Sequence, residues 1–356
     1  MTITENLKTI PFRDIPVDIL RGLAITLMVG ANLIPSLLLH PVPFGLRLVA
    51  SLAAPLFIFL SGMMVALSCR MKQHTFSYFL KRGVFVVIIA ALIDCVLLGS
   101  VPFIDTDVLY LIGISLPLAY LFLSLDLRTR MGIFIAILVA TPLLQGIVGY
   151  SPLPLMIPIQ ALMHGGALPA PITIFFQWCI EGWFPIFPWL AVSLLGAQAG
   201  MFRWQDGGIV SFAQPRLMML AGSILALGAL FWALLPGLML SRYGYVELFY
   251  PPTTEFLFFI TGVIFCLFII ADILPVSRRI FDPLRALGEC SLAIYILHTV
   301  IIIMFIQPLE IQVPLLLFFE CYLLFIAGMV IVAYLLRYVR KNVRTRSFVL
   351  RVLIGG

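Results

Sequence analysis

The chain has 356 residues, of which 62% are hydrophobic and only 11% charged, and its mean hydropathy is +1.14. A soluble domain is about half apolar and roughly a quarter charged, so this composition excludes one and indicates an integral membrane protein. The net charge of +6 needs no nucleic-acid partner, because basic residues also accumulate on the cytoplasmic side of membrane proteins.

Ten apolar segments are long enough to cross a bilayer, which takes about 20 residues in a helix. They cover residues 18–39, 45–69, 83–100, 107–124, 131–149, 183–201, 216–236, 255–272, 288–307 and 313–337. We therefore expect an all-α membrane protein with about ten transmembrane helices, located in the cell membrane. The first apolar run begins too late and is too long for a secretory signal.

The distribution of Lys and Arg predicts the orientation. Of the 22 basic residues, only Arg47 and Arg242 fall on the predicted outer side, so both termini are expected in the cytoplasm. The predicted organisation is a cytoplasmic segment over 1–17, a transmembrane domain over 18–337 and a basic cytoplasmic tail over 338–356.

Residues 150–182 are interrupted by prolines and glycines. If they formed an eleventh span, every later segment would invert and the charge asymmetry would vanish. We expect a long outer loop with a re-entrant or interfacial piece, and long loops of this kind are often functional.

The predicted outer surface is acidic and carries two histidines. Its titratable residues are His40, Asp105, Asp107, His164, Glu181, Glu247, Glu255 and Glu310. Acidic groups beside a cavity on the outer side can bind the hydroxyls or amines of a sugar. The alternative is that these are solvated loop side chains.

No motif of a soluble enzyme occurs, such as a glycine-rich nucleotide loop, Gly-x-Ser-x-Gly or His-Glu-x-x-His. The six cysteines lie in apolar segments without paired spacing, which predicts buried thiols and no metal site or disulfide framework.

A few polar residues lie inside predicted spans, where each is costly and so a functional candidate. Asp18 and Arg21 are three residues apart and share a helix face, which suits either an ion pair or a binding role. Asp94 lies near the outer end of the third span. Glu289 and His298 lie on the ninth, and His298 is equally well explained as a hydrogen-bonded packing residue.

Asn32 and His40 are the strongest catalytic candidates. His40 ends the first span on the outer side, where a neutral imidazole can accept a proton or attack an acyl carbonyl. Asn32 lies about two helical turns deeper, and its amide can donate a hydrogen bond to a carbonyl or a developing oxyanion. An interfacial histidine without a catalytic role is the competing interpretation.

Several motifs, taken in order, resemble the catalytic domain of heparan-α-glucosaminide N-acetyltransferase and its bacterial relatives among the transmembrane acyltransferases. They are Asp18-x-x-Arg21-Gly22, Met28-Val29-x-x-Asn32, His40, Pro55-Leu-Phe-Ile-Phe-Leu-Ser-Gly62, Phe184-Pro-Ile-Phe-Pro-Trp189, Leu195-Gly-Ala-Gln-Ala-Gly200, Leu287-Gly-Glu-Cys-Ser-Leu and Tyr295-x-x-His298. The interval between Asn32 and His40 is a few residues shorter than expected for the family. The related acyltransferase-3 family instead carries its key histidine at about the position of Asn32.

The resemblance implies that acetyl-CoA supplied from the cytosol acetylates an amino sugar or other glycan-type acceptor on the outer side, with His40 and Asn32 in the active site. His40 would activate the acceptor or carry the acetyl group itself, and the two schemes stay open. Arginine suits phosphate, so four basic residues are expected near the CoA entrance. They are Arg21, Lys81, Arg82 and Arg279. No metal is expected, and a homodimer is compatible with the family.

The main competing hypothesis is a proton-coupled transporter or flippase, since intramembrane acids and broken helices also suit a carrier. The sequence shows no convincing internal repeat, which argues against a carrier. A non-catalytic membrane scaffold is a third hypothesis. The identity of the acceptor and the choice between N- and O-acetylation are left open.

Overall fold

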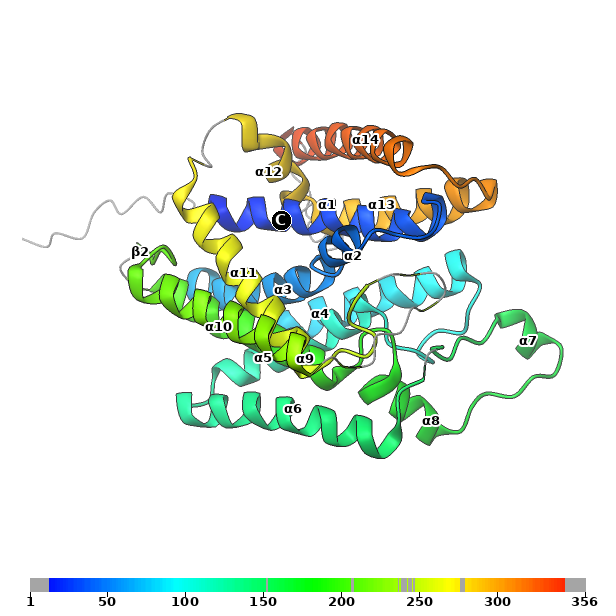
Figure 1. Cartoon of the computed structure of the whole chain (residues 1–356), viewed down its shortest axis with the longest axis horizontal. Helices are drawn as coiled ribbons and strands as arrows, with labels where there is room; N and C mark the ends of the chain where they lie inside the picture. The colour runs from blue at the N-terminus through cyan, green and yellow to red at the C-terminus, as the bar shows by residue number, and fades with distance from the viewer. Residues whose placement is uncertain are drawn as a thin grey trace, which may run out of the picture.

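The computed structural model describes residues 13–151, 153–205, 208–235, 237, 242, 245, 247–275 and 279–342. Within them nearly all of the regular secondary structure is helical (Figure 1). The α-helices are α1 Ile15–Leu37, α2 Phe44–Ala50, α3 Ala53–Lys72, α4 Phe76–Ile93, α5 Val108–Leu123, α6 Leu127–Val148, α7 Ile159–Met163, α8 Pro171–Phe176, α9 Ile186–Arg203, α10 Pro215–Leu234, α11 Thr254–Ile273, α12 Asp282–Glu289, α13 Ser291–Ile301 and α14 Leu315–Asn342.

Short elements interrupt or extend these helices. They are the π-helical turns η1 Asp94–Leu98, η2 Gln177–Glu181 and η4 Ile302–Ile306, the 3₁₀ turns η3 Arg279–Phe281 and η5 Gln307–Leu309, and an antiparallel pair of two-residue strands, β1 Trp204–Gln205 and β2 Gly208–Ile209. The predicted all-α membrane class is confirmed at this level.

Each of the ten predicted segments overlaps a helix. By length and composition, seven described helices are able to span a membrane, and an eighth if residues 171–181 and 186–203, which are bent by 47°, form one broken span. The predicted number of ten and the orientation of the termini stay predictions. Residues 150–182 hold the short helices α7 and α8, and their predicted re-entrant role also stays a prediction.

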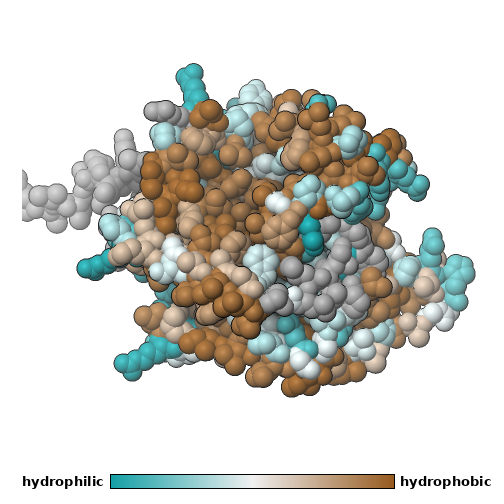
Figure 2. Space-filling model, in the orientation of Figure 1, coloured by the Kyte–Doolittle hydropathy of each residue, from teal (hydrophilic) through white to brown (hydrophobic). Residues whose placement is uncertain are grey.

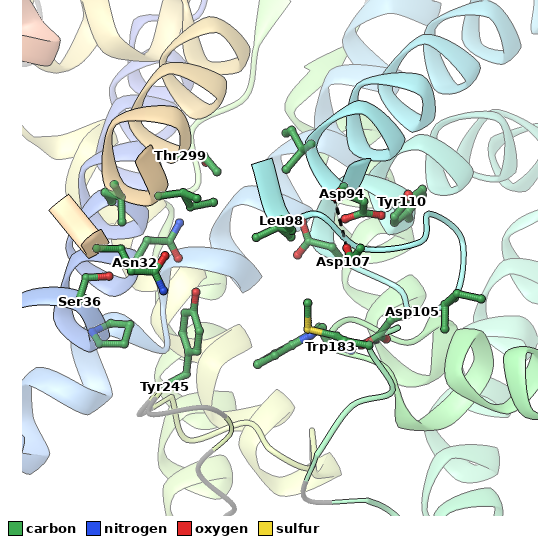
Figure 3. Close-up of a pocket in the computed structure, with 18 of the residues that line it drawn as sticks. Asn32, Ser36, Asp94, Leu98, Asp105, Asp107, Tyr110, Trp183, Tyr245 and Thr299 are labelled. Carbon is green, nitrogen blue, oxygen red and sulfur yellow. Dashed lines mark hydrogen bonds between the residues drawn. The ribbon is translucent and has the colours of Figure 1, made fainter. Parts of the chain in front are cut away.

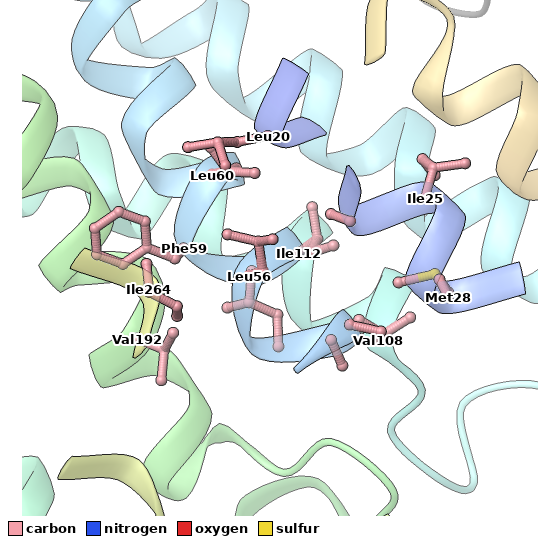
Figure 4. Close-up of a cluster of buried hydrophobic side chains, with 14 of the residues drawn as sticks. Leu20, Ile25, Met28, Leu56, Phe59, Leu60, Val108, Ile112, Val192 and Ile264 are labelled. Carbon is pink, nitrogen blue, oxygen red and sulfur yellow. The ribbon is translucent and has the colours of Figure 1, made fainter. Parts of the chain in front are cut away.

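The core is built around α3, which packs against α1, α5 and α9 and contacts aromatic rings of α11 through Phe59 (Figure 4). The side chains of Leu56 and Phe59 on α3 are fully buried. Glycines let α3 and α9 approach closely, since a Cβ on Gly62 would lie 1.8 Å from the carbonyl oxygen of Ser193. Gly196 is equally confined against Phe59 on the facing helix.

Helices α6, α10 and α14 lie outside this core. Only 11% of the apolar window of each is buried, and Ile147 and Leu324 are 82% and 75% exposed. Apolar residues cover most of the visible surface, with hydrophilic ones mainly toward its two ends (Figure 2). Such an apolar belt is what a lipid-facing surface requires.

One end of the bundle is fixed by a buried arginine. Asp14 precedes α1, and its carboxylate accepts a hydrogen bond from the N–H of Val17 as a helix cap. The same carboxylate binds Arg203 at the end of α9 at 2.5 Å, and Arg203 also binds Asp272 near the end of α11 at 2.8 Å. This network, which we call the Arg203 cluster (Asp14, Arg203, Asp272), holds three helix ends together.

The first and last described segments meet at this same end. Arg13 forms an ion pair with Glu289 at the end of α12, and Arg340 on α14 donates to Glu289 at 2.7 Å. The beginning of α1 and the end of α14 therefore lie on the same side of the bundle. This arrangement agrees with the predicted placement of both termini on one side of the membrane, although most of the terminal segments lies outside the described residues.

Candidate functional site

A cavity of about 660 Å³ opens at the end of the bundle where α1 finishes, away from the Arg203 cluster. Asn32 and Ser36 of α1 and Thr299 of α13 form one wall (Figure 3). Asp94 and Asp107 lie on the opposite wall. The volume falls in the range of sites that hold small molecules, roughly 300–1,000 Å³.

Asn32 and His298 form a hydrogen-bonded pair behind the first wall. The Nδ1 atom of His298 lies 3.0 Å from the carbonyl oxygen of Ile294 and must therefore carry the proton. Its Nε2 atom then accepts a hydrogen bond from Asn32 Nδ2 at 3.0 Å. His298 is fully buried, whereas Asn32 lines the cavity. The histidine thus orients the amide, and the second N–H of Asn32 is free to donate to a bound carbonyl.

Two of the π-helical turns contribute residues to the cavity. Asp94 begins η1, and Ile302 and Ile303 begin η4. A π-helical turn widens the helix locally and occurs frequently at functional sites. Here the two turns place Asp94, Leu98, Ile302 and Ile303 in the cavity lining.

The second wall carries carboxylates. Asp94 accepts a hydrogen bond from the hydroxyl of Tyr110 at 2.5 Å, and Asp107 accepts one from Tyr295 at 3.4 Å. Asp105, in the loop before α5, accepts from the backbone N–H groups of Thr106 and Trp183 at 2.6 and 3.2 Å. Burial raises the pKa of Asp105 to about 7, although these hydrogen bonds and the charge of Arg242 oppose the shift.

Arg242 fastens two loops beside the cavity. Its guanidinium is fully buried and donates to the carbonyl oxygens of Gly182, Ser151 and Glu181 at 2.8–2.9 Å. It also lies 4.5 Å from the ring centre of Tyr150. Nearby, the rings of Trp183 and Tyr245 meet edge to face at 5.4 Å, and both line the cavity. From the sequence, Arg242 was noted only as one of two basic residues on the predicted outer side. Its role in joining the two loops was missed.

His40 lies beyond the end of α1 with an exposed side chain. It is not among the residues that line the cavity. The preceding residue, Leu39, donates its backbone N–H to Val313 at 3.0 Å, next to Gln312 of the cavity lining. His40 is therefore near the cavity mouth, while the structure brings Asn32 together with His298. The predicted catalytic role of His40 stays a prediction.

The predicted CoA-binding residues lie toward the opposite end. Arg21 donates to the hydroxyl of Ser291 at 2.7 Å and lies 3.7 Å from Asp18, which is the expected ion pair. Asp18 also binds Arg13 at 2.6 Å. Arg82 is near enough to Arg21 for their charges to repel, and it donates to Tyr78 at 3.2 Å. Lys81 and Arg279 are exposed.

Glu289 is the centre of a second ion network at this end. Its buried carboxylate pairs with one arginine before α1, two on α14 and one on its own helix. They are Arg13, Arg337, Arg340 and, on α12, Arg285. From the sequence, Glu289 was identified only as a polar residue inside a predicted span and therefore as a functional candidate. Nothing in the sequence indicated that arginines surround it.

The sequence also missed the pairing of Asn32 with His298, which are 266 residues apart. The motif Tyr295-x-x-His298 was the one available signal, because Tyr295 lines the cavity and His298 binds Asn32. Nothing in the sequence alone linked Trp183 or Tyr245 to Asn32.

The sequence model of the family described as heparan-alpha-glucosaminide N-acetyltransferase, catalytic, matches residues 13–230. The match includes Asn32, His40, Asp94, Asp107 and Trp183 but ends before His298. No curated protein matches the chain. Since the family match covers more than half of the 356 residues, the chain belongs to this family of membrane-bound acetyltransferase catalytic domains.

Proposed function

We propose that the protein transfers an acetyl group from acetyl-CoA to an amino sugar or related glycan-type acceptor held in the cavity, at the outer side of the membrane. The observation that carries this proposal is the Asn32–His298 pair, whose amide faces a cavity of small-molecule size. The family match supplies the reaction class, which is acetyl transfer.

Asn32 is proposed to hold the thioester carbonyl through its free N–H. As the carbon becomes tetrahedral, negative charge grows on this oxygen, and a donor fixed in advance stabilises it most. His298 acts as a positioning residue, because its Nε2 fixes the direction of the amide. His40 near the cavity mouth remains the predicted proton acceptor or transient acetyl carrier.

The arginine-rich end is proposed as the entrance for CoA. At this end, five arginines share the carboxylates of Asp18, Asp282 and Glu289 in the described part of the chain: Arg13, Arg21, Arg285, Arg337 and Arg340. The surplus positive charge favours a polyanion such as the CoA phosphates. The pantetheine arm would then run between helices toward Asn32.

The test measures binding of acetyl-CoA and hydrolysis of its thioester by the detergent-purified protein. Replacing Asn32 with Ala is expected to reduce turnover by about 10²–10³-fold with binding retained, as for other oxyanion donors. His298→Ala is expected to cost less, about 10–100-fold, because it acts through Asn32. Glu320→Gln, at an exposed position on α14, is the matched control. Unchanged turnover in folded Asn32→Ala would refute the assigned role.

Two further variants examine the rest of the assignment. His40→Ala should abolish transfer if the predicted role is correct, and unchanged transfer would remove His40 from the mechanism. Arg21→Gln should raise the KM for acetyl-CoA several-fold, whereas Arg128→Gln, at the exposed start of α6, should not. Absence of any acetyl-CoA binding in folded protein would reject the acetyl-CoA proposal and favour a transporter.

A further inference from the structure

The wall opposite Asn32 has a charge pattern that the mechanism above does not use. Four carboxylates line the cavity, those of Asp94, Asp105, Asp107 and Glu310. Among the described lining residues there is no Lys, Arg or His. Figure 3 shows Asp94 and Asp107 side by side, across the cavity from Asn32.

No cationic side chain of the described residues compensates the charges of Asp94 and Asp107, whereas Arg242 partly compensates that of Asp105. Asp94 and Asp107 accept hydrogen bonds from the neutral hydroxyls of Tyr110 and Tyr295. The charges of Asp94 and Asp107 repel each other, as do those of Asp105 and Asp107. The Oδ2 atom of Asp105 is buried and accepts no hydrogen bond from the described residues.

A cation in the cavity would compensate these charges. Removing carboxylates from water is costly unless a positive charge or several hydrogen-bond donors replace the lost hydration. A primary ammonium group brings one positive charge and three N–H donors, and it fits between two adjacent carboxylates. The edge-to-face pair of Trp183 and Tyr245 adds aromatic surface on which the apolar face of a ring can rest.

We propose that Asp94 and Asp107 form the acceptor subsite and bind a protonated amino group of the acceptor, directly across from Asn32. The inference rests on the proposed function and makes it more specific. The acceptor is a compact molecule with a free amine and no negative charge. Sulfated or carboxylated glycans are rejected, because their anionic groups would enter a cavity lined by carboxylates.

The test measures acceptor binding to the full-length purified protein without acetyl-CoA, by calorimetry and by ligand-induced thermal stabilisation. The probes are glucosamine, glucose and glucosamine 6-sulfate, which share a ring and differ in charge. Glucosamine is expected to bind at least tenfold more tightly than either of the others. Equal or tighter binding of glucosamine 6-sulfate would overturn the inference, and so would equal binding of glucose.

Variants locate the subsite. Asp107→Asn and Asp94→Asn keep the shape of the side chain and remove its charge, so each should weaken glucosamine binding at least tenfold and reduce the preference over glucose. Glu320→Gln on the exposed face of α14 is the matched control and should bind as the wild type does. Wild-type affinity in both aspartate variants would overturn the assignment.

The two proposals fail in different ways. If glucosamine binds selectively but acetyl-CoA neither binds nor turns over, the subsite stands and the proposed function fails. If acetyl-CoA binds and is hydrolysed but glucosamine shows no preference over its analogues, the proposed function stands and the subsite fails.

Discussion

The two polar ends of the helix bundle hold their carboxylates in opposite ways. At the end where α1 begins, Asp14 and Asp272 bind Arg203, and Glu289 is surrounded by four arginines. At the cavity end, Asp94 and Asp107 accept hydrogen bonds from tyrosines. Paired charges stabilise the packing of helix ends, whereas carboxylates without a cationic partner in a cavity are available to a ligand. The contrast predicts that neutralising one carboxylate lowers the free energy of unfolding more at the end where α1 begins than at the cavity end.

The largest effect is expected in the Arg203 cluster. Asp272→Asn would leave Arg203 short of one negative partner at a position where only 1% of its side chain is exposed. Breaking a buried ion pair from one side costs about 3–5 kcal/mol in the free energy of unfolding. Thermal unfolding in detergent would measure the loss. A single variant as stable as the wild type would contradict this account.

Glu289→Gln should destabilise less, by about 2–3 kcal/mol, because its arginine partners are 14–36% exposed and water screens part of the charge. The same thermal assay applies. Raising the salt concentration should reduce the difference in unfolding temperature between Glu289→Gln and the wild type. The corresponding difference for Asp272→Asn should change less, since exposed charges are screened more strongly than buried ones. An identical salt response in both variants would be inconsistent with the difference in exposure.

The buried carboxyl of Asp105 should make stability depend on pH. Its pKa is raised from 3.8 to about 7, so the folded protein binds an extra proton between these values. The free energy of unfolding therefore falls as the pH rises from about 4 to 7, by at most about 1.4 kcal/mol per unit. Asp105→Asn should flatten the profile measured from pH 5.5 to 8.5 and stabilise the protein at its alkaline end. A profile unchanged by this substitution would show that another group is responsible.

The smallest effect on stability is expected at Asp107. Its long hydrogen bond to Tyr295 is retained by an amide oxygen, and removing the charge relieves repulsion with Asp94 and Asp105. Asp107→Asn should therefore change the free energy of unfolding by less than about 1 kcal/mol, or increase it. A loss as large as that in Asp272→Asn would remove the contrast between the two ends.

Much of the fold followed from simple patterns. Runs of apolar residues of membrane length predicted helices that the structure shows, because a bilayer requires every backbone group to bond within its own helix. The capping aspartates, such as Asp14 before α1 and Asp126 before α6, mark helix starts. The predicted count of ten spans goes beyond the seven or eight that length and composition support among the described residues. A short helix such as α5, with 16 residues, shows why length alone does not decide the count.

The sequence by itself determined the class of the protein, its apolar helical segments and its family motifs, and it identified Asn32 as a candidate residue. These properties depend on composition and local order, which a single chain displays directly. Only the tertiary structure decided that Asn32 pairs with His298, that arginines surround Glu289 and that Asp94 and Asp107 face Asn32 across a cavity. The physical reason is that these contacts join helices distant in sequence, and apolar helices carry little information about which neighbours they pack against.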